Sequence, residues 1–135
     1  IASDEDVRKA LEMADVWQDV QKFPEGVNTL IGSHGTVTLT SSLAARLSLA
    51  RAYLHPAALL LIDTLPNSLL SGRAGKNLKE YLESVKGKRT VIICTYHEEY
   101  MKIADTIVWL REFYAPLSGT RDGMFDKITV AGAIS

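Results

Sequence analysis

Cysteine is almost absent from this chain of 135 residues, which contains only Cys94, inside an apolar segment. A single thiol cannot form an internal disulfide, and this usage suits a reducing cytoplasm. We expect Cys94 to be a small buried hydrophobic residue. Long apolar runs are absent as well: the longest, residues 57–62, is far shorter than the roughly 18 residues of a membrane-spanning helix. No signal-peptide pattern opens the chain, so we expect it to be soluble.

A strong charge of either sign is also absent. Fifteen basic and sixteen acidic residues leave a net charge of -1. No overall field therefore favours nucleic acid or an anionic membrane surface, and we predict no nucleic-acid partner. With 47% hydrophobic residues, the chain can form one core, which fits a single domain or a large piece of one. Because it begins at Ile1 instead of methionine, we expect a fragment whose upstream part is missing.

Helical spacing dominates the first part of the chain. Ser3 is a candidate N-cap for a helix over residues 4–14, and a short second helix is expected around Trp17 and Val20, until Pro24 ends it. A longer helix follows, in which four apolar residues recur on one face before His55-Pro56 ends it: Leu43, Leu47, Ala50 and Leu54. Arg46 and Arg51 fall outside this stripe, and we expect them to form a solvated or salt-bridging face.

Strand-like apolar runs follow at residues 58–63, 90–95 and 106–110, of the kind that parallel strands buried on both faces require. Helical segments separate them, so the order predicts an α/β fold with right-handed crossovers. We predict a helical subdomain over residues 1–56. Residues 57–135 would then supply part of a parallel sheet with flanking helices.

Residues 39–64 place a hydroxyl-bearing turn, an amphipathic helix and a buried strand ending in Asp63 in direct succession. The turn reads LTSSL and the helix contains Leu-Ala-Arg-Ala at residues 49–52. This order resembles the signature helix and Walker B strand of ATP-binding cassette (ABC) proteins, whose signature is LSGGQ. The resemblance implies a P-loop NTPase-like (RecA-like) core. It also implies that four residues face the γ-phosphate of ATP held by a second cassette: Thr40, Ser41, Ser42 and Leu43.

The residues that bear the chemistry are altered. Serine replaces both glycines of the signature, and the added Cβ atoms should weaken or reshape the phosphate contact. Taken alone, the turn is an ordinary Ser/Thr N-cap. By resemblance Asp63 holds Mg²⁺, but Thr64 stands at the position of the catalytic glutamate and cannot act as a general base at neutral pH. We therefore expect weak or absent hydrolysis at this chain's own site.

Two further segments match the family pattern. His97 follows the second strand and matches the switch histidine; taken alone, a histidine at a junction of strand and helix is more often a capping residue. The dimer-interface loop corresponds to four residues that lack the usual aspartate: Asn67, Ser68, Leu69 and Leu70. The opening residues 1–20 and the turn and helix at residues 119–125 resemble the family as well, and residues 32–39 are one residue longer than usual. Residues 128–135 support no functional assignment.

The ATP cradle itself is missing from this chain. Residues 72–77 suggest a Walker A loop, but Leu70 and Asn77 break the G-x-x-x-x-G-K-[ST] pattern, and the segment follows the Walker B strand instead of the first strand. We expect a plain loop and helix start there. Neither a true Walker A loop nor a glutamine loop occurs in the sequence.

The leading hypothesis is a degenerate, exporter-type nucleotide-binding domain, represented by its C-terminal portion. The resemblance implies ATP and Mg²⁺ as cofactors of the complete domain. It implies two partners, a second ABC nucleotide-binding domain and the transmembrane domains of a transporter, at the cytoplasmic face of a membrane. The alternative is a non-catalytic pseudo-ATPase that acts as a regulatory or scaffolding interaction module.

Overall fold

The computed structural model describes residues 2–32, 35 and 37–132. Ile1, part of the connection before Leu39 and the last residues of the unassigned 128–135 segment lie outside the described residues. The chain forms two compact units, residues 1–92 and 93–135. The predicted division of this chain near residue 56, into two parts of one partial domain, stays a prediction.

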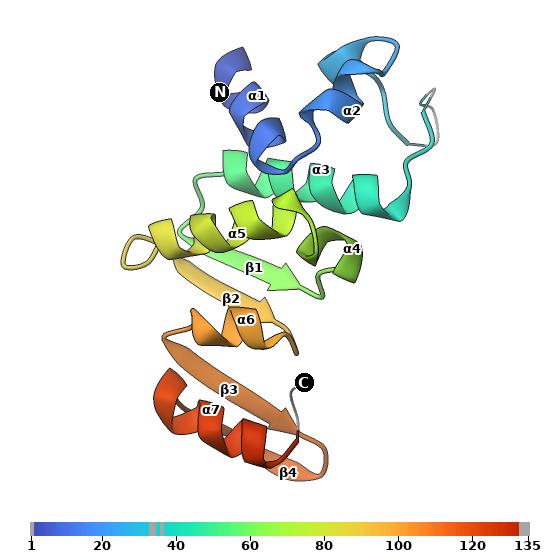
Figure 1. Cartoon of the computed structure of the whole chain (residues 1–135). Helices are drawn as coiled ribbons and strands as arrows, with labels where there is room; N and C mark the ends of the chain where they lie inside the picture. The colour runs from blue at the N-terminus through green and yellow to red at the C-terminus, as the bar shows by residue number, and fades with distance from the viewer. Residues whose placement is uncertain (1, 33–34, 36, 133–135) are drawn as a thin grey trace. The chain divides into compact units, whose positions relative to one another are not determined.

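The first unit has a helical part and a small sheet (Figure 1). Its elements are α1 (Asp4–Met13), α2 (Trp17–Gln21), the 3-10 helix η1 (Gly26–Asn28), α3 (Ser41–Leu54), β1 (Leu59–Asp63), α4 (Asn67–Leu70), α5 (Arg73–Ser84) and β2 (Thr90–Cys94), the last of which runs past the unit boundary. These bounds confirm the four helices and two strands predicted for this region, and α5 confirms that residues 72–77 are a loop and helix start. The short helix α4 was not predicted.

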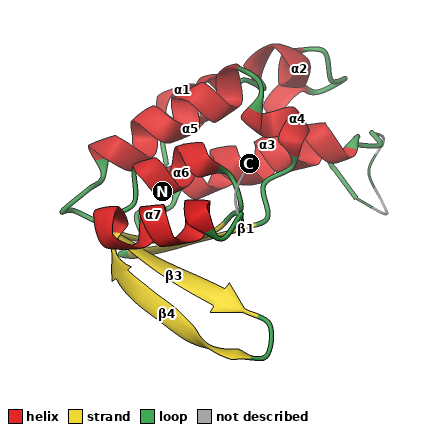
Figure 2. Cartoon of the chain, turned by 60° about the horizontal axis from the view of Figure 1, so that its bottom comes forward, coloured by secondary structure: helices red, strands yellow, loops and turns green. Residues whose placement is uncertain are grey.

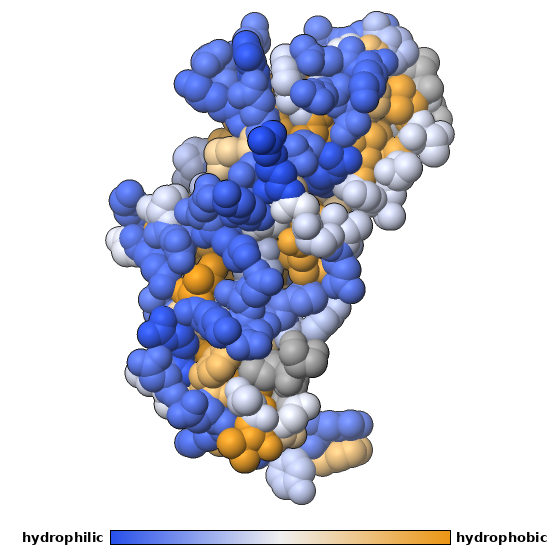
Figure 3. Space-filling view, in the orientation of Figure 1, coloured by the Kyte–Doolittle hydropathy of each residue, from blue (hydrophilic) through white to orange (hydrophobic). Residues whose placement is uncertain are grey.

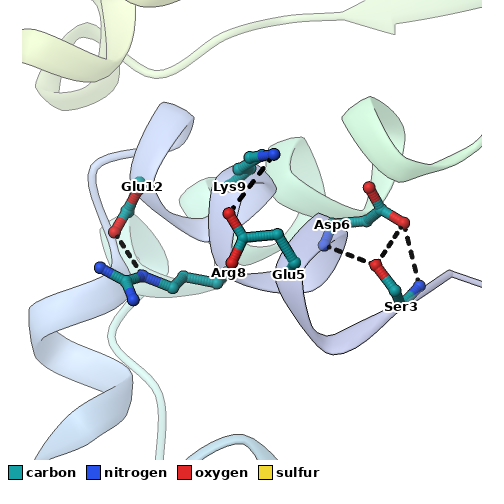
Figure 4. A network of polar contacts seen from close by, with 6 residues as sticks. All are labelled: Ser3, Glu5, Asp6, Arg8, Lys9 and Glu12. Carbon is teal, nitrogen blue, oxygen red and sulfur yellow. Dashed lines mark hydrogen bonds and ion pairs between the residues drawn. The ribbon is translucent and has the colours of Figure 1, made fainter.

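Ser3 caps α1 as expected and forms a capping box with Asp6 (Figure 4). The backbone N–H of Asp6 donates to the Ser3 hydroxyl (3.2 Å), while the Ser3 backbone N–H donates to the Asp6 carboxylate (3.0 Å). The hydroxyl also donates to that carboxylate (2.7 Å). Hydrogen bonds from the Ser3 side chain and then its backbone hold the pKa of the Asp6 carboxyl below its usual value. Two capping interactions therefore fix where α1 begins.

The C-terminal end of α1 is a Schellman motif built on Asp15. The backbone N–H of Val16 donates to the carbonyl of Leu11 (2.9 Å), and that of Asp15 donates to the carbonyl of Glu12 (3.0 Å). Asp15 takes the left-handed conformation that this motif requires, with φ of 55°. Ala14 and Val16 on either side are fully buried. We call residues 14–16 the α1–α2 corner.

Side chains from α3 and α5 hold this corner in place. The Arg46 guanidinium donates to the carbonyl of Asp15 and forms an ion pair with Asp19 of α2 (3.1 Å). The amide nitrogen of Asn77 in α5 donates to the carbonyl of Met13 (2.8 Å). The salt-bridging role expected for Arg46 is confirmed, whereas Arg51 is exposed in the last turn of α3.

The sheet of the first unit joins β1 to β2, which run in the same direction (Figure 1). Leu60 and Ile62 are buried, but Leu59, Leu61 and Ile92 are 47%, 66% and 53% exposed. The expectation of burial on both faces is therefore wrong for this chain, because no layer of the first unit's described residues covers the second face. Cys94 was also expected to be buried and is exposed.

The second unit contains α6 (Glu98–Lys102), β3 (Thr106–Arg111), β4 (Tyr114–Thr120) and α7 (Arg121–Val130). Figure 2 shows β3 and β4 as a hairpin. The two strands pair antiparallel, with Trp109 opposite Leu117. The predicted parallel pairing of residues 106–110 is therefore wrong within the described part of the chain. The core of this unit consists of Ile107, Met124 and Ile128, with Met101, Ala104 and Trp109 packed against it.

The capping box of α1 gives a stability prediction. Ser3→Ala removes both side-chain hydrogen bonds and should lower the free energy of unfolding by about 1 kcal/mol at pH 7, measured by denaturant titration. The part of this loss due to Asp6 should vanish at acid pH. The lowered pKa of Asp6 contributes stability that is fully present above its unfolded pKa and is lost as the pH falls through the folded value.

Ser48 in the exposed middle of α3 provides the matched control, because Ser48→Ala removes a hydroxyl from a helix without removing a cap. That substitution should leave stability unchanged or slightly raised. Equal losses in the two variants would contradict the role assigned to the capping box.

Candidate functional site

The signature-like turn and the end of the Walker B-like strand both belong to the first unit. Figure 1 places the start of α3 and the end of β1 on the same side of this unit, next to α4. Helix α4 packs against α3 and α5. The structure thus gathers two of the predicted site segments at one end of the first unit.

Thr40 is the N-cap of α3, with φ of -69° and ψ of 156°. Its hydroxyl oxygen accepts the backbone N–H of Leu43 (3.2 Å). That hydroxyl keeps its proton free to donate, and the first turn of the helix contains no acidic residue. The positive end of the helix dipole is therefore not neutralised by a side chain of its own first turn, which suits an anion.

Ser41 and Ser42 are the first two residues of α3, and Ser41 is exposed. Their backbone is helical, a conformation that serine adopts without strain. Glycine at these two positions would therefore change the steric access to the helix terminus, while the backbone geometry would stay the same. The side chain of Leu43 is half-buried, so it contributes partly to packing.

Asp63 ends β1 and is exposed. The Thr64 hydroxyl donates to one oxygen of its carboxylate (3.0 Å). Thr64 itself has φ of 41°, a left-handed conformation that β-branched residues rarely adopt. The residue at the position of the family's glutamate is thus strained, and its side chain is turned back to the neighbouring aspartate.

The four residues of the predicted dimer-interface loop form α4 and differ in accessibility. Asn67 and Ser68 are exposed, Leu70 is half-buried and Leu69 is 1% exposed. Leu69 is one of the largest fully buried side chains among the described residues. Asn67 and Ser68 are therefore the two that a partner could contact, and Leu69 anchors the loop to the core.

His97 lies in the second unit at the N-cap of α6. Its backbone N–H donates to the Thr95 hydroxyl (3.0 Å), but its side chain forms no capping hydrogen bond. The ring lies against Tyr96, with centroids 4.2 Å apart. Within the described part of the chain, the buried Nε2 atom has no hydrogen-bond partner. The side chain is therefore not used as a cap.

A resident metal site is not formed by these residues. Among the residues that the structure describes, no group of three or more His, Cys, Asp and Glu side chains could hold a metal ion. Mg²⁺ is commonly bound through one or two carboxylates together with substrate phosphates and water. The single carboxylate of Asp63, with one oxygen bonded to Thr64, fits Mg²⁺ that arrives with a nucleotide.

Several features outside the predicted site were not foreseen. A groove of about 630 Å³ lies between α1 and α5, lined by residues such as Lys9 and Asn77, and includes none of the predicted site residues. Tyr100 of α6 is 3% exposed, and burial, followed by the negative charge of Glu99, raises its pKa to about 12. Helical spacing alone does not reveal either feature, because both depend on tertiary packing.

An apolar surface patch lies on the helical part of the first unit. Figure 3 shows hydrophobic atoms at the surface near α2 and the loop after it. Val27, Leu30 and Ile31 are 53%, 72% and 48% exposed there. Adjacent exposed apolar side chains of this kind mark protein contacts more often than isolated ones do.

The order of elements and the placement of Asp63 are compatible with part of a P-loop NTPase-like domain. The first unit supplies two neighbouring strands of such a sheet, with helices packed on it, and an acidic residue at the end of one strand. Among the described residues, none of the helices has the length and apolarity to cross a membrane.

Comparison with known proteins supports the ABC family for this chain. It is 30% identical over 126 residues to a mitochondrial potassium channel ATP-binding subunit of Pongo abelii, covering 93% of this chain and 17% of that protein. It is 30% identical over 111 residues to ABC transporter B family member 21 of Arabidopsis thaliana, covering 82% and 8%. It is 31% identical over 108 residues to the multidrug resistance-like ATP-binding protein MdlA of Buchnera aphidicola, covering 79% and 18%.

These relatives are much longer than the chain, which spans between 8% and 18% of their lengths. No protein-family model matches it. The similarity supports the ABC family for the part of these relatives that the chain matches.

The strained backbone at Thr64 gives a second prediction. Thr64→Gly removes the Cβ atom that makes φ of 41° unfavourable and should raise the free energy of unfolding by about 1 kcal/mol, measured by denaturant titration. Thr90→Gly is the matched control, because Thr90 lies in the ordinary extended backbone of β2 and should lose stability instead. A loss of stability in both variants would show that Thr64 is not strained in solution.

Proposed function

We propose that this chain is the C-terminal portion of the nucleotide-binding domain of an exporter-type ABC transporter. In this proposal the turn at residues 40–43 faces the nucleotide bound by a second nucleotide-binding domain. The observation on which the proposal depends is the start of α3, where Thr40 caps a helix terminus without acidic residues. The similarity over most of the chain to transporter ATP-binding subunits supports it.

The chain's own nucleotide site is impaired in this proposal. Asp63 would contact Mg²⁺ carried by ATP, and His97 would approach the γ-phosphate. Thr64 has no carboxylate to polarise water, and its hydroxyl is bonded to Asp63. The partner domain would therefore hydrolyse the nucleotide that faces residues 40–43, while the nucleotide near Asp63 would turn over slowly.

The transmembrane domains of the transporter would be the other partner, at the cytoplasmic face of the membrane. The exposed Val27, Leu30 and Ile31 provide an apolar surface for a protein contact on the helical part of the first unit. Coupling of ATP binding and hydrolysis to transport would then pass through the complete domain.

A second candidate is a non-catalytic pseudo-ATPase that acts as an interaction module. The strained Thr64 and the serines at positions 41 and 42 favour it, because each alters a position that the family uses for chemistry. The full-length protein separates the two candidates, since a transporter needs a P-loop and membrane-spanning segments.

The absent phosphate cradle predicts how the chain alone behaves. We expect the 135-residue chain to bind Mg-ATP with a dissociation constant above about 1 mM, because the backbone N–H groups and lysine of a P-loop are missing from its sequence. Isothermal titration calorimetry with Mg-ATP tests this, and Asp63→Asn should leave the weak signal unchanged. Micromolar affinity would require a cradle within this chain and would contradict the proposal.

Repair of Thr64 and repair of the two serines should affect two different nucleotides. In the assembled full-length protein, Thr64→Glu should raise hydrolysis at the site near Asp63 by about 10²-fold, a value at the low end of general-base catalysis. The pair Ser41→Gly and Ser42→Gly should instead change hydrolysis of the nucleotide bound by the partner. Single-turnover assays with one site disabled at a time distinguish these results.

Two results would count against the proposed arrangement. One is stimulation of the same nucleotide by both repairs. The other is a wild-type rate at the Thr64 site equal to that of an intact cassette, since a threonine would then be sufficient for hydrolysis.

A further inference from the structure

Arg46 connects the signature-like turn to the rest of the helical part. It lies six residues after Thr40, in the second turn of α3, and its side chain is 22% exposed. The guanidinium reaches Asp15 and Asp19, which belong to the α1–α2 corner and to α2. Both contacts therefore join α3 to elements that precede it by about 30 residues in the sequence.

The chemistry of this contact explains why arginine suits the position. The carbonyl of Asp15 belongs to the C-terminal end of α1, where the helix dipole is negative and no basic residue of α1 itself is present in the last turn. The carboxylate of Asp19 adds a full negative charge 3.1 Å from the guanidinium. Both contacts are made by the same terminal nitrogen, Nη1, whose two N–H bonds can donate to the two acceptors at once.

The corner that Arg46 contacts is itself immobilised. Ala14 and Val16 are fully buried, and Asn77 of α5 donates to the carbonyl of Met13 (2.8 Å). A displacement of α3 along its axis would separate Arg46 from the Asp15 carbonyl, which lies in this anchored corner. The start of α3, less than two turns away, would move by the same amount because the helix is rigid.

We propose that Arg46 is a positioning residue that fixes the signature-like turn, residues 40–43, relative to the α1–α2 corner. This inference rests on the proposed function, because the position of the turn matters only if it meets a nucleotide. Arg46 does not touch the nucleotide in this proposal. Its effect is on the distance between the helix terminus and the phosphate, and a displacement of about 1 Å can lower a catalytic rate by up to about 10²-fold.

The test measures kcat and KM for ATP hydrolysis at the partner's nucleotide in the assembled full-length protein. Arg46→Ala should lower kcat by about tenfold with less than a twofold change in KM, because the alignment in the transition state is lost while nucleotide binding stays with the partner. Arg46→Lys keeps a charged nitrogen with enough N–H donors for both acceptors and should recover kcat to within about threefold of wild type. Asp19→Asn keeps the Asp15 contact and should give an intermediate kcat.

Arg51→Ala is the matched control, since Arg51 lies on the same helix, is exposed and should leave kcat unchanged. If Arg46→Ala does not fold, Asp19→Asn provides the test on its own, with kcat reduced and the thermal unfolding midpoint near that of wild type. Ser42→Glu tests the proposed function separately, because a negative charge at the helix terminus should repel the phosphate.

The outcomes separate the two ideas. If Ser42→Glu has no effect on the partner's nucleotide, the proposed function is wrong. If Ser42→Glu lowers kcat but the Arg46 and Asp19 variants match wild type, only the positioning role is wrong. Equal losses in Arg46→Ala and Arg51→Ala, or no recovery in Arg46→Lys, would also overturn the positioning role.

Discussion

The packing of helices in the first unit depends on the carbonyl groups at the C-terminal end of α1. They accept hydrogen bonds from Asn77 of α5 and Arg46 of α3, so the last turn of one helix joins three helices. A helix terminus leaves such carbonyls without partners inside the helix, and buried ones must be satisfied elsewhere. The fully buried Ala14 and Val16 anchor this end in the core. The position of the start of α3 therefore depends on the hydrogen bonds that the C-terminal end of α1 accepts.

Local signals in the sequence were sufficient to predict most helices and the first two strands. Ser3 marks the start of α1 and His55-Pro56 the end of α3 through interactions within a few residues. The pairing of β3 could not be predicted in this way. Which strand pairs with β3 depends on the tertiary structure around it, and local sequence signals do not report that. Strand β4 was missed since Pro116 and Gly119 interrupt its alternation, and an edge strand tolerates such residues.

The sequence predicts which residues of the candidate site follow one another along the chain. It does not predict how their side chains are buried or hydrogen-bonded. The succession from Thr40 to Asp63 followed from motif spacing, and the Thr40 cap was an explicit alternative that the structure also contains. Burial of Leu69 within a predicted interface loop, and the return of the Thr64 hydroxyl to Asp63, depend on the path of the chain after β1. Motif spacing gives no information on that path. A capping role is the alternative interpretation of His97, but its side chain forms no capping hydrogen bond.

The altered positions of the site differ in the physical effect of the change. Ser41 and Ser42 occupy helical backbone, so the change from glycine adds side-chain bulk and no conformational strain. Thr64 lacks the carboxylate that the chemistry needs and also occupies a left-handed conformation that opposes a β-branched residue. In the proposed function, the first kind of change would limit how closely a phosphate can approach an otherwise intact helix terminus. The second combines a missing functional group with a strained backbone, so the two halves of a composite site would be impaired unequally, with the greater impairment beside Asp63.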